Sequence, residues 1–178
     1  MSVKAKLLSG FREALDKGGL SRAMRFLNQS VAYRFSAVYV FSGGTLQNVC
    51  LIDKLEPEVS KTDDIPIEES YCAFIRRTAK PFSVIDSLND PRVDGHSKQP
   101  IIHSYYGLPL LGAAGQLLGT VCHFDYDTRP LVEETVDFLD AVAPLIVGAL
   151  KHGSIIPPTT NPSHSEMKPK SPPDKGVA

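Results

Sequence analysis

The chain has 178 residues, of which 42% are hydrophobic and 22% charged, and its formal net charge is −1. These values are typical of one globular domain with its own core, and they argue against a second independent domain. A nearly neutral chain creates no global field that attracts nucleic acid or an anionic membrane, so we expect neither as a partner.

The cysteines and the chain ends indicate the compartment. Cys50, Cys72 and Cys122 are odd in number and include no C-x-x-C pair. We therefore predict neither a disulfide framework nor a structural zinc site. The first residues lack the apolar stretch of a signal peptide, and no run approaches the roughly 18 apolar residues that span a bilayer. A cytoplasmic protein is expected, with the proline-rich residues 154–178 as a disordered tail.

Two helices are predicted over residues 3–34. The first presents one apolar face and ends at the Gly18-Gly19 pair. The second runs from about Leu20 to Tyr33, and its apolar residues step by four and three positions along a narrow seam. The two apolar faces consist of Leu7, Leu8, Phe11 and Leu15, and of Leu20, Met24, Leu27 and Val31.

Strands are predicted over residues 36–41 and 46–52, joined as a hairpin, and over 82–85, 103–111 and 117–124. Between them we expect a helix from Ile67 to Thr78. Asp63 and Asp64 should accept hydrogen bonds from its free amides, and Pro66 suits its first turn. A sheet core over 36–125 with one inserted helix and helices at both ends favours an α+β fold.

The last helix is predicted over residues 130–151. Val132, Val136, Leu139, Ala143, Ile146 and Leu150 form nearly three heptads of one seam. Phe138, Leu145 and Ala149 form a second stripe, whereas Pro144 should bend the helix. Because two faces require burial, we expect one to cover the sheet and the other to form a homodimer.

Five segments carry a family resemblance: residues 69–76, 81–86, 90–92, 104–110 and 115–125. In this order and spacing they resemble the GAF domains of bacterial sensor proteins, over about residues 20–150. The resemblance implies a central antiparallel sheet of about five to six strands. It places the N- and C-terminal helices on one face. On the other face, the predicted helix and the loop over 86–102 would roof a pocket.

Similarity to bilin-binding GAF domains also implies which side chains face that pocket. The first and last strands would contribute Tyr39, Phe41, Thr120, Cys122 and Phe124, by the alternation of strand side chains. We expect His103, Tyr106 and Leu108 nearby, and Phe74 pointing inward from the roof helix.

The sequence gives less support to bilin attachment or to a metal site. The chain from Pro91 to Tyr106 lacks the cysteine that would tether a bilin, and Cys122 and His123 should point to opposite faces of one strand. His96, His103 and Glu69 have no metal-ligand spacing. The Asp90-Pro91-Arg92 turn either places a cation over the pocket mouth or is a local ion pair. We expect no metal and no resident cofactor.

These observations predict a non-enzymatic GAF-type sensory domain. It would bind a small organic molecule, or relay a signal to a partner protein, through its terminal helices. One alternative is a thiol-dependent reductase of the free methionine sulfoxide type, because Cys72 and Cys122 could both lie near the pocket, although their flanking residues do not match that pattern. The other alternative is a protein-interaction module without a ligand.

Overall fold

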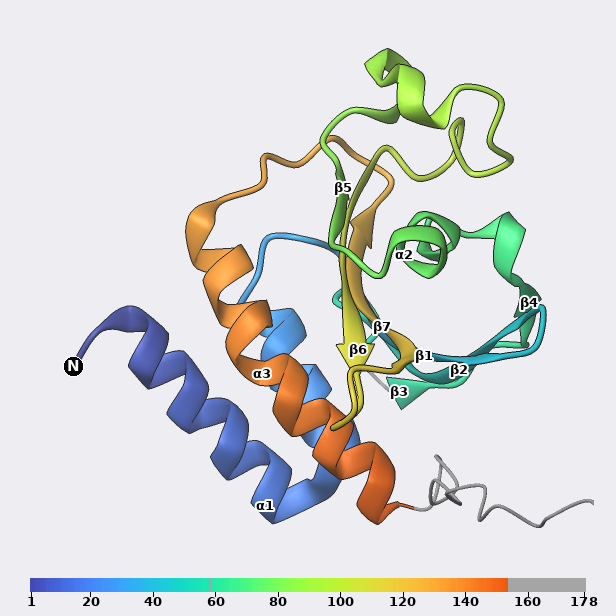
Figure 1. The fold of residues 1–178 in the computed structure, drawn as a ribbon. Helices are drawn as coiled ribbons and strands as arrows, with labels where there is room; N and C mark the ends of the chain where they lie inside the picture. Colours follow the sequence, from blue (N-terminus) through green and yellow to red (C-terminus); the bar gives the residue numbers. More distant parts are fainter. Residues whose placement is uncertain (58, 154–178) are drawn as a thin grey trace, which may run out of the picture.

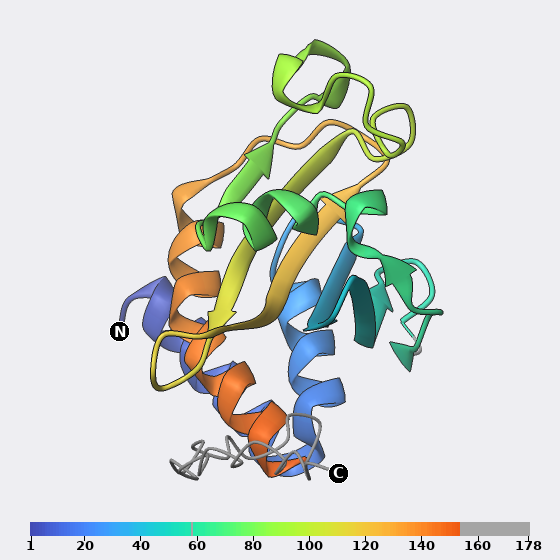
Figure 2. The same cartoon turned by 45° about the vertical axis from the view of Figure 1, so that its right-hand side comes forward.

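A computed structural model describes residues 1–57 and 59–153 of the chain (Figures 1 and 2). Its core is one antiparallel sheet with the strand order β3-β2-β1-β7-β6-β5, and β4 pairs with β2 beside β3. The expected tail over 154–178 lies outside the described residues. No helix in the described part of the chain is long and apolar enough to cross a membrane.

Four long strands form the middle of the sheet, and three short strands lie at its edges. The long strands are β1 (Phe35–Ser42), β2 (Thr45–Asp53), β6 (Ser104–Leu111) and β7 (Leu117–Asp125). The short strands are β3 (Val59–Ser60), β4 (Ile65–Pro66) and β5 (Phe82–Val84). The antiparallel α+β prediction is confirmed: β1 and β2 form one hairpin, β6 and β7 form another, and the pairing of β1 with β7 joins the two.

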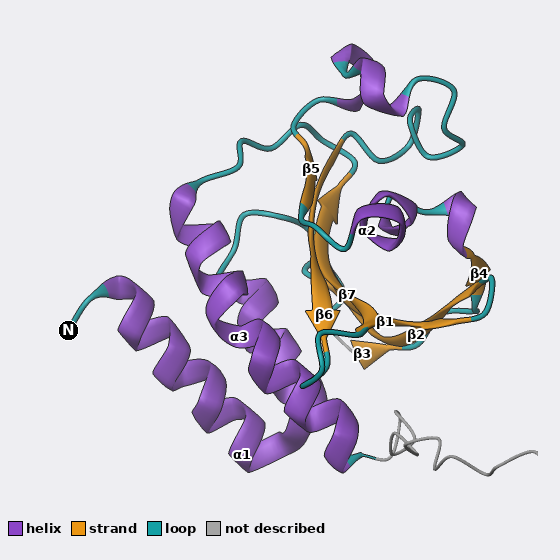
Figure 3. Cartoon of the chain, viewed as in Figure 1, coloured by secondary structure: helices purple, strands orange, loops and turns teal. Residues whose placement is uncertain are grey.

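Helices cover both faces of the sheet, as Figure 3 shows. Helices α1 (Val3–Gln29) and α3 (Glu133–His152) pack on one face, which we call the rear. Helix α2 (Cys72–Thr78) lies over the other face, which we call the front. The front also carries η1 (Ile67–Glu69), and the loop after β5 contains η2 (Ser87–Asn89) and η3 (Pro91–Val93).

The Gly18-Gly19 pair divides α1 into two segments, as predicted. Gly19 has a φ of 67°, outside the helical region, so the chain turns there and the second segment runs back along the first (Figure 1). The first segment covers α3. The Phe138 ring packs edge-on against Phe11 at 6.4 Å and Phe26 at 6.5 Å. Phe138, the largest member of the second stripe of α3, is therefore covered within the chain.

A β-bulge in β2 determines which of its side chains point to the front and which to the rear. Val38 pairs with Cys50 but Tyr39 pairs with Asn48, so Val49 is the extra residue. A bulge reverses the alternation of side chains along the strand. Consequently Leu46 belongs to the front core, whereas Cys50 belongs to the rear core.

The predicted start of the roof helix is wrong. Ile65 and Pro66 form β4 against Leu46 and Thr45, and the Ile67 N–H donates to the Gly44 carbonyl at 3.0 Å. Helix α2 begins only at Cys72, whose N–H donates to Ser70 Oγ at 3.1 Å, and neither predicted aspartate caps it. Pairing with the edge of the sheet thus replaced the helix turn that local capping signals favoured. Helix α3 likewise begins later than predicted, at Glu133.

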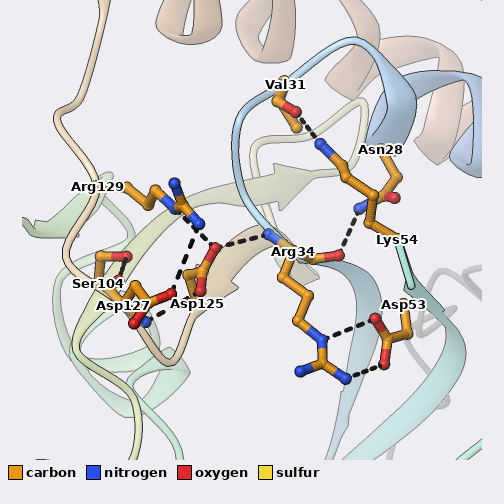
Figure 4. A network of polar contacts seen from close by, with 9 residues as sticks. All are labelled: Asn28, Val31, Arg34, Asp53, Lys54, Ser104, Asp125, Asp127 and Arg129. Atoms are coloured by element: carbon orange, nitrogen blue, oxygen red, sulfur yellow. Dashed lines mark hydrogen bonds and ion pairs between the residues drawn. The ribbon is translucent and has the colours of Figure 1, made fainter. Parts of the chain in front are cut away.

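A polar network joins the ends of α1, β1, β2 and β7 (Figure 4). Asp125 is almost fully buried, and its carboxylate accepts hydrogen bonds from Arg34 N at 2.9 Å, Asp127 N at 3.0 Å and Arg129 Nε at 2.9 Å. The Arg34 side chain in turn makes a two-pronged ion pair with Asp53 at 2.9 and 2.8 Å. Burial raises the pKa of Asp125, but these donors outweigh burial and lower it.

We expect Asp125→Asn to lower the free energy of unfolding by about 1–3 kcal/mol, because buried donors lose a charged acceptor. The difference from wild type should shrink as the pH falls below about 4. The carboxylate's lowered pKa stabilises the fold above the ordinary carboxyl pKa, and this contribution is lost in acid. Urea denaturation at several pH values measures both effects.

Asp127→Asn is the matched control. The Asp127 side chain is 81% exposed, and its ion pair with Arg129 is long, at 3.8 Å. It should change the free energy of unfolding by less than about 0.5 kcal/mol. Equal effects of the two variants would contradict the role assigned to Asp125.

Gly119 marks the closest approach of β7 and β1. A Cβ atom at this position would lie 1.9 Å from the Tyr39 carbonyl oxygen, which belongs to the backbone and cannot move aside. We expect Gly119→Ala to lower the free energy of unfolding by at least about 2 kcal/mol. In α3, by contrast, a Cβ atom at Gly148 would meet nothing within 4 Å. We therefore expect Gly148→Ala to raise the free energy of unfolding by about 0.5–1 kcal/mol. Thermal unfolding of the pair tests the contrast, and a tolerated Gly119→Ala would refute it.

Candidate functional site

A cavity of about 210 Å³ lies on the front of the sheet, and we call it the front cavity. Strands β1 and β7 form its floor. The segment before α2 and the end of the long loop over residues 86–102 form its walls and roof. It is lined by Tyr39, Ile65, Ser70, Tyr71, Lys98, Ile101, Ile102, Tyr105, Cys122, Phe124 and Tyr126.

The loop over the front cavity is held by specific contacts. Ser87 Oγ donates to the Gln99 carbonyl at 2.7 Å, and Gln99 Nε2 donates to the Ser87 carbonyl at 3.0 Å. Tyr71 Oη donates to the Ile102 carbonyl at 3.2 Å, which ties the loop to the segment that enters α2. The cavity therefore has a defined roof.

The lining is mostly aromatic and aliphatic, with few polar groups. Lys98 is the one charged side chain among these lining residues. Burial raises the pKa of Tyr39 and Tyr105 well above the ordinary tyrosine value, so both hydroxyls stay protonated. Such a site suits a small apolar ligand, with one cation available for an anionic group.

Two buried thiols lie at the front of the sheet. Cys122 on β7 lines the floor of the cavity, and Cys72, the first residue of α2, lies over the same face of β7. Cys72 Sγ also lies 3.2 Å from Tyr105 Oη and 3.3 Å from Thr120 Oγ1. Both cysteines are free and buried. We call Cys72 and Cys122 the thiol pair.

The two members of the thiol pair differ in acidity. Burial raises the pKa of Cys72, but hydrogen bonds to its sulfur outweigh burial and lower it; they come from Cys122, Ser70, Thr120 and Tyr105. The pKa of Cys122 lies well above the ordinary value, because its thiol donates to Cys72 and is itself buried.

Several predicted site residues come together in this region. Tyr39, Cys122 and Phe124 line the front cavity. Thr120 is buried just behind the lining and contacts Cys72. Phe41 lies on the same face but packs under Arg76, 5.5 Å from the guanidinium, outside the lining.

Other predicted residues lie elsewhere. Phe74 stacks on Phe82 at 4.2 Å and lines an open surface hollow on the outer side of α2. The backbone N–H of His103 bonds to the Asp125 carbonyl, and its side chain is not in the lining. Arg92 makes a local ion pair with Asp90 and donates to the Ser83 carbonyl at 2.7 Å, which is the turn interpretation of that motif.

The expectation that Tyr106 and Leu108 face the pocket is wrong. Both belong to the rear core, against the terminal helices. In the observed register Cys122 pairs with Gly107 and Thr120 with Pro109, and paired residues share a face. Tyr105 therefore takes the front position that had been assigned to Tyr106. The sequence Tyr105-Tyr106 carries no signal for this choice, because register decides it.

The predicted separation of Cys122 and His123 is confirmed. His123 points to the rear, where its Nδ1 lies 2.7 Å from Ser36 Oγ and its ring stacks on Tyr33 at 5.7 Å. Burial lowers the pKa of His123 to about 3, so the imidazole is neutral, and its Nδ1 shares a hydrogen bond with the Ser36 hydroxyl. Asn28 on α1 donates to Ser36 Oγ at 2.9 Å. A polar connection thus runs from β7 to α1.

Two further features bear on the choice of site. A larger hollow of about 660 Å³ lies between the two segments of α1, on the rear of the molecule, and it is lined by α1 alone. Among residues 1–57 and 59–153, no group of three or more His, Cys, Asp or Glu side chains is placed to hold a metal ion. The front cavity is therefore the better candidate.

No protein-family model matches the sequence. A curated relative is the cyclic di-GMP phosphodiesterase PA2567 of Pseudomonas aeruginosa, which is 34% identical over 89 residues. The match covers 48% of this chain but only 15% of the relative, so the chain spans a small part of that protein's length.

Solved structures match over most of the chain. The GAF domain of an Acinetobacter phosphoenolpyruvate-protein phosphotransferase superposes with a TM-score of 0.71 at 10% identity, over 87% of this chain and 97% of that domain. A type II free methionine-R-sulfoxide reductase from Thermoplasma acidophilum gives a TM-score of 0.60 at 16% identity, over 80% and 95%. At these identities the likeness concerns the fold alone. This chain has the fold of a GAF domain.

Proposed function

We propose that this protein is a sensory domain that binds a small organic molecule in the front cavity. The observation that carries the proposal is the cavity itself: a defined roof, an aromatic and aliphatic lining and one cation. Its volume of about 210 Å³ lies below the roughly 300–1,000 Å³ of sites for drug-sized ligands. The ligand is therefore a compact molecule, and Lys98 favours one with a carboxylate.

The same strands connect the cavity to the terminal helices. On β7, Cys122 faces the cavity while its neighbour His123 bonds to Ser36, and Ser36 bonds to Asn28 of α1. A ligand that prefers one position of β7 or of the roof shifts the population of that arrangement. The neutral, fully buried His123 transmits the shift to α1, from which a partner protein receives the signal.

Benzoate and benzamide are suitable probes, because they share shape but differ in charge. We expect benzoate to bind more tightly, and Lys98→Gln to weaken benzoate binding about fivefold with little effect on benzamide, since a partly exposed ion pair is worth about 1 kcal/mol. Isothermal titration calorimetry measures both. Lys80→Gln, an exposed lysine outside the lining, is the control and should bind both probes as the wild type does. Absence of binding by either probe, together with no small molecule retained in native mass spectra, would refute the proposal.

The position of both members of the thiol pair at the front of the sheet favours a second candidate, a thiol-dependent reductase of the free methionine sulfoxide type. Such an enzyme needs one sulfur to attack and another to resolve the intermediate. The Thermoplasma reductase shares the fold. This candidate predicts multiple turnovers of free methionine sulfoxide with dithiothreitol, and their loss in the Cys72→Ser/Cys122→Ser double variant. If the wild type gives no turnover, the reductase candidate is excluded and ligand binding stands.

A further inference from the structure

The thiol pair combines three properties that a redox-sensitive site needs. The two sulfurs lie on the same face of the sheet, because Cys72 Sγ is 3.3 Å from Thr120 Oγ1 and Cys122 is the next residue of β7 on that face. They come from separate elements, the roof helix α2 and the central strand β7. One of them, Cys122, lines the front cavity and so is within reach of a small molecule that enters it.

The surroundings of Cys72 favour its reaction as a nucleophile. Tyr105 Oη and Thr120 Oγ1 lie within 3.3 Å of its sulfur and can donate hydrogen bonds to a thiolate. The lowered pKa of Cys72 agrees with this geometry. Cys50 provides a contrast within the same chain: it faces the rear core, and burial raises its pKa to about 12.

We propose that the thiol pair is a modification site at which a small hydroperoxide forms a reversible Cys72–Cys122 disulfide. The inference goes beyond ligand binding, because it requires an oxidant and not a resident ligand. The disulfide would fasten the roof helix to the sheet and so fix the wall of the front cavity. It differs from the reductase candidate in being a stoichiometric change of the protein.

The reaction has two steps. The Cys122 sulfur attacks the hydroperoxide, an S–O bond forms as the O–O bond breaks, and the alkoxide leaves with the Cys122 proton as an alcohol. The Cys72 thiol loses its proton to solvent, and the thiolate then attacks the Cys122 sulfur. An S–S bond forms as the S–O bond breaks, and the hydroxide leaves and takes up a proton from solvent as water. The two thiols lose two electrons, and the hydroperoxide is reduced to alcohol and water.

The test treats the reduced, full-length protein with tert-butyl hydroperoxide in slight excess. Free thiols are then counted in denaturant, and disulfide-linked peptides are mapped by mass spectrometry. The protein has three free thiols. We expect the count to fall from three to one, with Cys50 as the remaining thiol, and dithiothreitol to restore all three.

Single variants identify the members of the pair. Cys72→Ser and Cys122→Ser should each abolish the cross-link, whereas the matched Cys50→Ser variant should form it at the wild-type rate. The map of the wild-type protein tests the proposal even if a variant does not fold.

Three results would overturn the inference: an unchanged count of thiols, a disulfide that includes Cys50, or oxidation of one cysteine to a sulfinic acid without a cross-link. None of these results depends on benzoate binding by the reduced protein. The failure of this inference and the failure of the proposed function are therefore distinguishable.

Discussion

Strand β7 is the centre of the molecule, because it is paired on both edges and covered on both faces. Between β1 and β6 its backbone groups are used in the sheet, and its side chains alternate between two cores. Thr120 and Cys122 point to the front, whereas Val121 and His123 point to the rear. A shift of β7 by one residue would exchange these sets, and it would place a histidine in the cavity and a thiol under the helices.

A polar network forms where β7 leaves its two buried faces. Asp125 ends β7 at the point where the chain leaves the sheet, and it collects donors from the start of β1 and from the segment before α3. Buried backbone N–H groups need acceptors, and a carboxylate with several donors remains charged even when buried. The network thereby fixes the register of β7 relative to β1, on which the identity of the cavity floor depends.

The front and rear have different chemistry because of what covers them. The rear is sealed by two long helices, and its buried polar groups form a short connection among Asn28, Ser36 and His123. The front is covered by one short helix and a loop, which leave room for a small molecule and place Cys72 over the same face of β7 as Cys122. A ligand and an oxidant would thus act on the same wall of the cavity. Under the proposed function, both influences on β7 would reach α1 through His123.

Local signals in the sequence were sufficient for many features. The Gly18-Gly19 break, the hairpin of β1 and β2, the four long strands and the opposite directions of Cys122 and His123 follow from backbone preferences and from the period of strand side chains. The resemblance carried by residues 69–125 predicted the sheet with its terminal helices on one face and the cavity on the other. Tyr39, Cys122 and Phe124 were placed correctly at that cavity.

Tertiary pairing decided the rest. The register of β6 against β7 turned Tyr105 rather than Tyr106 to the front, and nothing in two adjacent tyrosines distinguishes them. Pairing with β2 made a strand of Ile65 and Pro66, where capping signals had favoured a helix. Lys98, Ile101 and Ile102 joined the lining because a long loop folds back over the sheet. The sequence by itself determined the elements and their periodicity, because those depend on neighbouring residues. Only the tertiary structure decided which side chains meet, because that depends on register and on contacts between distant segments.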